Sequence, residues 1–354
     1  MRARAILGTR RAAHDVKGGH GGAPPLGTST LDPESASRIY AAHTFPHLST
    51  LSSTIMRSSC ILAPTLFLSH GAGPAFFMDG QGSMFSDIDE HSVPAKAFRE
   101  VGKNPEAHGL PASPDAIVIV SAHWEEGDAI HVMGTEKPKL LFDYSGFPRE
   151  TYSLSYPAPG NPALAKEIVQ MINTEFEKKA ETPVRATLDL SSRGWDHGVF
   201  LPLLLLYPKA NIPVVQISLH ESLDPNLHVS LGQALSPLRA KNILIVGSGQ
   251  ATHPMSTRKG GSQIGSFMKW LESVLLSGSS ESRADRLIGG LKDDSIRPLI
   301  RYAHNPRIEH FMPLFTVVGA SSGTTGKELF SHAGGKDWRF VDGSFSLATY
   351  IFGS

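Results

Sequence analysis

Short apolar runs recur along the chain, each flanked by proline, glycine or polar residues. They are TLFLS at 65–69, AIVIVSAH at 116–123, IPVVQISL at 212–219 and ILIVGSG at 243–249. Runs of this length, rich in β-branched residues and without strict polar alternation, are typical of strands buried on both faces of a sheet. The pattern therefore predicts a parallel or mixed sheet at the centre of the protein.

Between these runs, apolar residues recur at helical spacing. The longest such segment is 162–179, where Pro162 stands near the start, a position at which proline is tolerated. Further helices are predicted around 95–101, 227–238, 262–277 and 283–291. Strands that alternate with helices predict an α/β fold, here a single domain whose central, mostly parallel or mixed sheet carries helices on both faces. The apolar run FMPLFTVVGA at 311–320 fits a late strand and a buried helix equally.

Residues 1–58 differ from the rest of the chain. Arginine, serine and small residues are abundant there, acidic residues are few, and no long periodic apolar segment occurs. This composition predicts a disordered or transit-peptide-like extension ahead of a globular domain at 59–354. A translation start at Met56 is the alternative. The predicted location is cytoplasmic, or chloroplast or mitochondrial if 1–58 is a transit peptide.

Composition narrows the range of functions. The 33 basic and 33 acidic residues balance, so nothing indicates a nucleic-acid partner. The lone cysteine, Cys60, excludes an internal disulfide framework and a cysteine-rich zinc site. The apolar run at 199–208 is far shorter than the roughly 20 residues that span a bilayer, so we expect a soluble protein without a membrane partner.

Four histidines follow predicted strands or the turns after them, and they carry the main functional indication. They are His70, His123, His253 and His310. Parallel strands bring their carboxyl ends to one edge of a sheet, so such side chains can converge. For any one of them, a hydrogen-bonded strand end is the ordinary alternative.

Neutral imidazole is a common ligand for iron, zinc and copper, and a catalytic centre needs about three protein ligands. His70 and His123 are the strongest candidates. His253 follows a GSG segment at which the backbone can turn sharply, and His310 has Glu309 beside it. The third ligand is therefore a histidine or a carboxylate, as in two-histidine-one-carboxylate iron sites.

Other residues are candidates for catalysis and substrate contact. His197, in the segment RGWDHG, opens a predicted helix and suits a general base or a hydrogen-bond donor. Its neighbour Asp196 need not touch it, since adjacent side chains on a helix diverge. Tyr144 and Phe147 lie in an aromatic segment rich in glycine and proline, and Trp124 follows His123. We expect these three aromatic residues to contact the substrate.

Other chemistries find less support. The chain has no GxSxG nucleophile elbow and no Walker loop, and GSGQAT lacks the third glycine of a dinucleotide fingerprint. Ser248 could act as a nucleophile, but no base is marked for it.

Taken together, these segments resemble the class III extradiol ring-cleavage dioxygenases, most closely those of the 4,5-DOPA extradiol dioxygenase type. The matching stretches, in order from about residue 64, include FLSHGAGP, PDAIVIVSAHW, FDYSGFP, YPAPGNPALA, RGWDHGVFLPLLLLYP, ILIVGSGQATHP and AHNPRIEHFMPLFTVVGA. As a set they are specific, whereas DHG alone is not. The resemblance implies that 59–354 is the catalytic domain.

The resemblance also implies roles for single residues. His70, His123 and His310 match metal ligands, His253 matches a histidine that serves as a further ligand or as the catalytic acid–base, and His197 matches a second active-site histidine. The implied metal is iron(II), with zinc as the alternative. The implied partners are dioxygen and a small DOPA-like catechol, cleaved to a semialdehyde acid by a monomer or homodimer.

The chain departs from the family pattern at three points: HGAGP replaces the commoner HGSP, the stretch 80–113 is longer, and PMSTRKG after His253 follows the family only in part. The resemblance therefore implies a catechol without fixing DOPA. The alternatives are a non-catalytic, Memo-like protein with a four-histidine zinc site, and a zinc hydrolase that uses metal-bound hydroxide. Metal identity and oxygen uptake distinguish the three.

Overall fold

The computed structural model describes residues 62–179, 183–191, 193–255, 261–278, 280–321, 324–330, 340–341 and 345–353. The predicted extension at 1–58 lies outside these residues. Eight strands form one sheet in the order β4-β3-β5-β2-β6-β1-β10-β7. Their bounds are β1 Thr65–Ser69, β2 Ala116–Glu126, β3 Ile130–Met133, β4 Ala186–Asp189, β5 Val214–His220, β6 Ile243–Gly249, β7 Gly326–Glu328 and β10 Tyr350–Phe352. A separate pair is formed by β8 Phe340–Val341 and β9 Phe345–Ser346.

The centre of the sheet is parallel and its edges are mixed. Strands β5, β2, β6 and β1 are neighbours and run in the same direction. Strand β10 is antiparallel to β1 and to β7, and β3 is antiparallel to β5. The four central strands are the four apolar runs of the sequence, and the predicted α/β class with a mixed sheet is confirmed.

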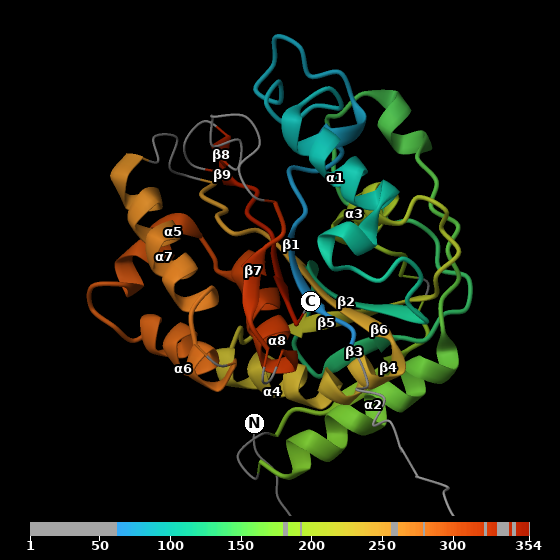
Figure 1. The fold of residues 1–354 in the computed structure, drawn as a ribbon. Coiled ribbons are helices and arrows are strands. Elements are labelled where there is room, and N and C mark those ends of the chain that lie inside the picture. The colour runs from blue at the N-terminus through green and yellow to red at the C-terminus, as the bar shows by residue number, and fades with distance from the viewer. Residues whose placement is uncertain are drawn as a thin grey trace, which may run out of the picture. The chain divides into compact units, whose positions relative to one another are not determined.

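Side chains on the central strands alternate between two buried cores. On β2, Val118 and Val120 enter one core, whereas Ile117 and Ile119 enter the other. This two-sided burial explains why the strands read as continuous apolar runs. Helices cover both faces, as predicted (Figure 1).

The first core is covered by α2 Pro162–Glu177, α4 Pro225–Leu235, α5 Gly261–Leu275, α6 Ser280–Gly290, α7 Arg297–Ala303 and α8 Met312–Ala320. The second is covered by α1 Val93–Lys103 and α3 His197–Leu206. Short 3-10 helices are η1 Ala75–Phe77, η2 Pro105–His108, η3 Arg149–Ser153, η4 Ser236–Lys241 and η5 Glu309–Phe311.

The ambiguous run at 311–320 is a helix. Every residue of α8 is buried, so its apolar positions show no period that could separate a helix from a strand. This corrects one placement: His310 does not follow a strand but lies in η5, directly before α8.

Candidate metal centre

Three predicted ligands meet beyond the carboxyl ends of β1 and β6 and in the last part of β2. His70 directly follows β1, and its backbone N–H donates to the carbonyl of Gly249 at the end of β6 (3.1 Å). His123 lies within an irregularity in the pairing of β2 with β5, between Val120 and Glu125. The backbone N–H of Gln250 donates to the carbonyl of His310 (2.9 Å), which ties η5 to the end of β6.

Two glycines of β6 allow this close approach. A Cβ atom at Gly249 would lie 2.1 Å from the carbonyl oxygen of His310, and one at Gly247 would lie 2.4 Å from that of Pro313. The GSG segment thus lets η5 and α8 pack directly on the strand. This differs from the sharp turn that the sequence suggested, because both glycines belong to β6 itself.

The Nε2 atoms of the three histidines face one another. His123 Nε2 lies 3.2 Å from His70 Nε2 and 3.3 Å from His310 Nε2. Two nitrogens bound to one ion at about 2.1 Å, with roughly 90–110° between them, lie about 3.0–3.4 Å apart. The observed spacing is therefore that of ligands to a shared metal ion.

The other ring nitrogen of each histidine faces an acceptor. His70 Nδ1 lies 3.0 Å from Ser248 Oγ, and that hydroxyl donates onward to the carbonyl of Gly198, so it accepts from His70. His310 Nδ1 lies 2.9 Å from Glu309 Oε1. These contacts place the proton on Nδ1 and leave Nε2 with a free lone pair.

His123 follows the same rule through a longer contact. Its Nδ1 lies 3.5 Å from Asp143 Oδ2, which favours the proton on that nitrogen. Three unprotonated nitrogens this close repel one another unless a cation lies between them. The donor set of His70, His123 and His310 therefore fits a divalent metal, with nitrogen ligands suited to iron or zinc.

Burial keeps these rings neutral. It lowers the pKa of His70, His123 and His310 well below the usual value for histidine, and the charges of neighbouring histidines lower each pKa further. Neutral imidazole is the form that binds metal, so no proton has to leave these rings at pH 7.

The structure separates His253 and Glu309 from this three-nitrogen group. The His253 ring stacks on His310 with centroids 3.7 Å apart and planes at 10°, and its ligand atom groups with Glu309 and His310 rather than with His70 and His123. Glu309 contacts the Nδ1 side of His310, away from the facing Nε2 atoms. His253, Glu309 and His310 form a second group with metal-ligand spacing, so the ligand role of His253 and the carboxylate alternative at Glu309 stay predictions.

His197 lies beside His123, one of the three facing histidines. Its ring centroid is 3.9 Å from that of His123, and its Nδ1 lies 2.8 Å from Asp143 Oδ1. A Cβ atom at Gly198 would come within 3.2 Å of the His123 ring, so glycine lets the first turn of α3 approach the site. His197 thus packs against His123, whereas His253 packs against His310.

Two carboxylates that the sequence reasoning did not assign support the site. Burial tends to raise the pKa of Asp143, but the hydrogen bond from His197 and the charges of His197 and His123 outweigh it and hold that pKa below the usual value. Asp143 is the acidic residue of the FDYSGFP stretch, which was the available signal.

Asp196 points away from His197, as expected for adjacent residues. It accepts from Ser121 Oγ (2.7 Å) and from the Gln216 side chain, and it pairs with Arg193, which also donates to the carbonyl of His123 (2.9 Å). Burial raises its pKa, and the charge of nearby Asp143 adds to this shift. This network fixes the backbone of β2 beneath the site.

Aromatic side chains adjoin the histidines on the His197 side. The Tyr144 ring lies edge-on to His197 with centroids 5.9 Å apart, and Phe147 lies 5.6 Å from Tyr144. Phe85, from the long stretch 80–113, lies 5.5 Å from Phe147. These rings form an apolar wall beside the site.

Trp124 does not belong to that wall. Its side chain is 1% exposed, its Nε1 donates to Glu126 (2.7 Å), and the Arg193 guanidinium covers its ring at 4.9 Å. The irregularity in β2 lies between Val120 and Glu125, so a residue beside His123 need not face the same space. The expected substrate contact of Trp124 is corrected to support of Arg193.

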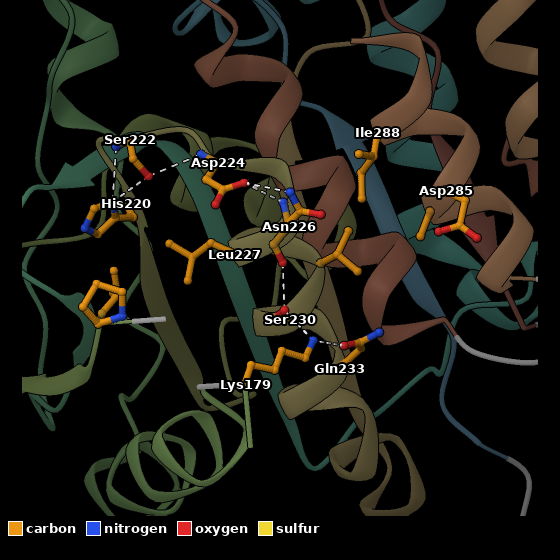
Figure 2. A pocket seen from close by; sticks show the side chains of 14 residues that line it. Lys179, His220, Ser222, Asp224, Asn226, Leu227, Ser230, Gln233, Asp285 and Ile288 are labelled. Carbon is orange, nitrogen blue, oxygen red and sulfur yellow. Dashed lines mark hydrogen bonds between the residues drawn. The ribbon is translucent and has the colours of Figure 1, made fainter. Parts of the chain in front are cut away.

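A wide groove of about 1210 Å³ lies elsewhere, between α4, α6 and the segment that follows α2 (Figure 2). In it Lys179 donates to Ser230 and Gln233, and His220 contacts Ser222, so these polar side chains satisfy one another. None of the predicted site residues lines it.

Comparison with known proteins identifies the family. Residues 64–340 match the model of the catalytic LigB subunit of aromatic ring-opening dioxygenase. The chain is 34% identical over 304 residues to a 4,5-DOPA dioxygenase extradiol of Beta vulgaris, covering 84% of this chain and 100% of that protein. It is 35% identical over 299 residues to dioxygenase tasH of Hapsidospora irregularis, covering 81% and 85%.

A bacterial relative and a crystal structure agree. The 4,5-DOPA dioxygenase extradiol of Escherichia coli K12 is 32% identical over 270 residues, covering 74% of this chain and 90% of that protein. The crystal structure of an uncharacterized protein from Escherichia coli K12 superposes with a TM-score of 0.58 at 27% identity, covering 82% of this chain and 99% of that one.

The helices give no sign of a membrane span: in the described part of the chain, none has the length and apolar content to cross a bilayer. The match over 64–340 and the identities above confirm the resemblance stated from the sequence. The chain belongs to the LigB family of class III extradiol dioxygenases and is an aromatic ring-opening dioxygenase.

Proposed function

We propose that this protein cleaves a catechol-type aromatic compound beside its diol with dioxygen, in a metal-dependent reaction that yields a semialdehyde acid. The observation that carries the proposal is the set of three facing Nε2 atoms from His70, His123 and His310, each with an acceptor at the opposite ring nitrogen. We propose iron(II) as the resident metal, with zinc as the alternative.

These three histidines would hold the ion. When bound, iron(II) supplies electrons to dioxygen and a Lewis acid for the catechol oxygens. The site needs, in addition, groups that take and return protons, because a catechol loses protons on binding and an oxygen atom must be protonated later.

His253 and His197 are placed for that proton transfer. Burial lowers the pKa of His253 below the usual value, although the charge of Glu309 opposes the shift, so its neutral ring can accept a catechol proton. The Nδ1–H of His197 donates to Asp143, so its Nε2 can accept a catechol proton and, once protonated, can donate a hydrogen bond to developing oxygen charge. Each histidine therefore has one nitrogen with which to hold or move a proton.

The aromatic wall favours a flat substrate. Tyr144 stays protonated, since burial raises its pKa to about 12, and its hydroxyl donates to the carbonyl of Thr151 (2.8 Å). Its ring and that of Phe147 present apolar surfaces beside His197. Several relatives bear the name 4,5-DOPA dioxygenase extradiol, and we propose a DOPA-like catechol on that ground.

The test is oxygen uptake by protein loaded anaerobically with iron(II), measured against DOPA, caffeate and protocatechuate, together with absorbance for a yellow semialdehyde. We expect one dioxygen consumed per catechol cleaved. His123→Ala should abolish uptake, whereas the control His91→Ala, at an exposed position, should not. Absence of uptake with every catechol, in protein that binds zinc tightly, would contradict the proposal.

A further inference from the structure

One carboxylate contacts two histidines of different function. Asp143 Oδ1 lies 2.8 Å from Nδ1 of His197, and Asp143 Oδ2 lies 3.5 Å from Nδ1 of His123. The two rings are in direct contact, with centroids 3.9 Å apart. The metal ligand and the proton-transfer histidine therefore share a single acceptor.

The position of Asp143 is fixed from several directions. Its Oδ1 also accepts the backbone N–H of His197 (2.9 Å), the first residue of α3, where a negative charge is favourable. Just before it, the N–H of Leu141 donates to the carbonyl of Trp195 (2.7 Å). Just after it, Tyr144 bonds to Thr151. The carboxylate is thus held by α3 and by its own loop.

An ionised carboxylate accepts hydrogen bonds and donates none. Facing two Nδ1 atoms, it favours the tautomer of both rings in which Nδ1 carries the proton and Nε2 does not. In the other tautomer, Nδ1 would present a lone pair to the carboxylate, and Nε2 could neither bind a metal nor accept a proton.

We propose that Asp143 is a positioning residue that couples the ligand His123 to His197 by holding both rings in the tautomer with a free Nε2. The metal-binding part rests on the function proposed above, whereas the tautomer of His197 does not. A loop that carries part of the aromatic wall, at Tyr144 and Phe147, would then also set the chemistry of the site.

The variant Asp143→Leu separates this role from mere packing. The backbone N–H and Nδ1 of His197 both contact Oδ1, so an asparagine could still accept from both, whereas leucine has a similar shape and no acceptor for either ring. The matched control is Asp128→Leu, which removes another aspartate–histidine contact, to His131 at 3.1 Å, at an exposed position.

The direct readout is the ¹⁵N chemical shift of His197 in zinc-loaded, ¹⁵N-histidine-labelled protein, which needs no turnover. In the wild type we expect the proton of His197 on Nδ1. In Asp143→Leu we expect most of it on Nε2, and Asp143→Glu should restore Nδ1 in part. Zinc affinity should fall about 10–100-fold in Asp143→Leu and stay unchanged in Asp128→Leu.

A second readout is the energetic coupling between Asp143 and His197, measured through kcat in a double-mutant comparison. At saturating metal, Asp143→Leu should lower kcat about 100-fold in the wild type but have little effect in a His197→Ala background, because its catalytic effect passes through that ring. Additive losses in the two backgrounds would overturn the proposal.

The tautomer of His197 tests the proposal without any measurement of activity. A His197 proton on Nε2 in the wild type, or one that stays on Nδ1 in Asp143→Leu, overturns the proposal; the wild-type spectrum gives this test even if the variant does not fold. If the tautomer shifts as expected but no catechol is cleaved, the proposed function fails and the role of Asp143 at His197 stands.

Discussion

At the scale of single residues, the site depends on the acceptors behind the ligands. Ser248 is fully buried on β6 and accepts from His70 while it donates to Gly198. The Glu309 carboxylate accepts from His310 Nδ1 and, unlike a hydroxyl, has no proton to donate. Such contacts fix the ring orientation and the tautomer of a metal ligand.

We therefore expect Ser248→Ala to weaken metal binding about 10–100-fold, because it removes the acceptor of the His70 Nδ1 proton. It should also cost about 1–3 kcal/mol of stability, since two buried polar groups lose their partner. Competition with a chelator and urea unfolding measure the two effects. Ser273→Ala, which removes an exposed serine hydroxyl bonded to Trp270, is the control. Metal affinity equal to that of the wild type would contradict the role of Ser248.

Loss of the His253 ring should, unlike loss of the Ser248 hydroxyl, leave metal binding intact. Since it stacks on His310 without joining the facing nitrogens, His253→Ala should keep one metal per chain while kcat falls about 100-fold or more. Metal analysis and steady-state kinetics on the same preparation check this. Full turnover by the variant would show that His253 does not transfer protons. Loss of the metal would show that His253 is a ligand.

The sequence indicates the candidate ligand histidines more clearly than the residues that support them. His70 and His123 stand out because each stands at the end of a short apolar run. Asp143 reaches the site only through a loop whose path no local pattern encodes, and Trp124 was misassigned because an irregular strand hides which side a residue faces. Tertiary contacts decide both cases.

At the scale of elements, the packing of α4 against α8 holds the helix that follows η5 and His310. The two helices meet at glycines: a Cβ atom at Gly232 would lie 2.0 Å from the carbonyl oxygen of Thr316, and one at Gly319 would lie 2.2 Å from that of Val229. Both carbonyl oxygens belong to the backbone, so a side chain at either glycine position must move a helix.

We expect Gly232→Ala to destabilise the protein by about 1–3 kcal/mol or more through this overlap. Gly265→Ala in α5 is the matched control. Its Cβ atom would have nothing within 4 Å, so the better helix propensity of alanine should stabilise by about 0.5–1 kcal/mol. Urea unfolding compares the two variants. Equal effects would show that α4 and α8 do not meet as described.

A buried histidine links α4 to β5 and should make stability depend on pH. His228 Nδ1 donates to the carbonyl of Asp224 (2.7 Å), and its Nε2 accepts the N–H of His220 (3.3 Å), so only the neutral ring fits. Burial lowers its pKa to about 4, whereas histidine in an unfolded chain titrates near 6.5.

The unfolded chain therefore binds more protons between these values, and stability falls as pH drops from about 6.5 to about 4. The loss from His228 should approach about 3 kcal/mol. We expect metal-free His228→Gln to lose less stability than the wild type across this range, with exposed His91→Gln as the control. Parallel curves for His228→Gln and the wild type would contradict this.

Elements were predictable where burial was two-sided or a period was visible. The four central strands and α2 follow directly from the sequence, whereas β3, β4, β7 and β10 are three or four residues long and carry too little pattern. The helix α8 was ambiguous because burial on all sides removes the period.

At the scale of the whole molecule, the sheet brings together residues 240 positions apart in sequence, from His70 to His310. The fold class and the family could be predicted from the sequence, because the order of strands, helices and motif stretches is a property of the chain. The set of three facing nitrogens could not, since it depends on how closely β6 and η5 approach at Gly249.

The central claim is that one metal ion, held by three histidines, supports ring cleavage. The most direct measurement is an anaerobic titration of metal-free protein with iron(II), followed by the rate of catechol-dependent oxygen uptake at each point. We predict a linear rise that ends at one iron per chain in the wild type, and no rise in His123→Ala. Uptake that is independent of iron, or that His123→Ala retains, would contradict the account.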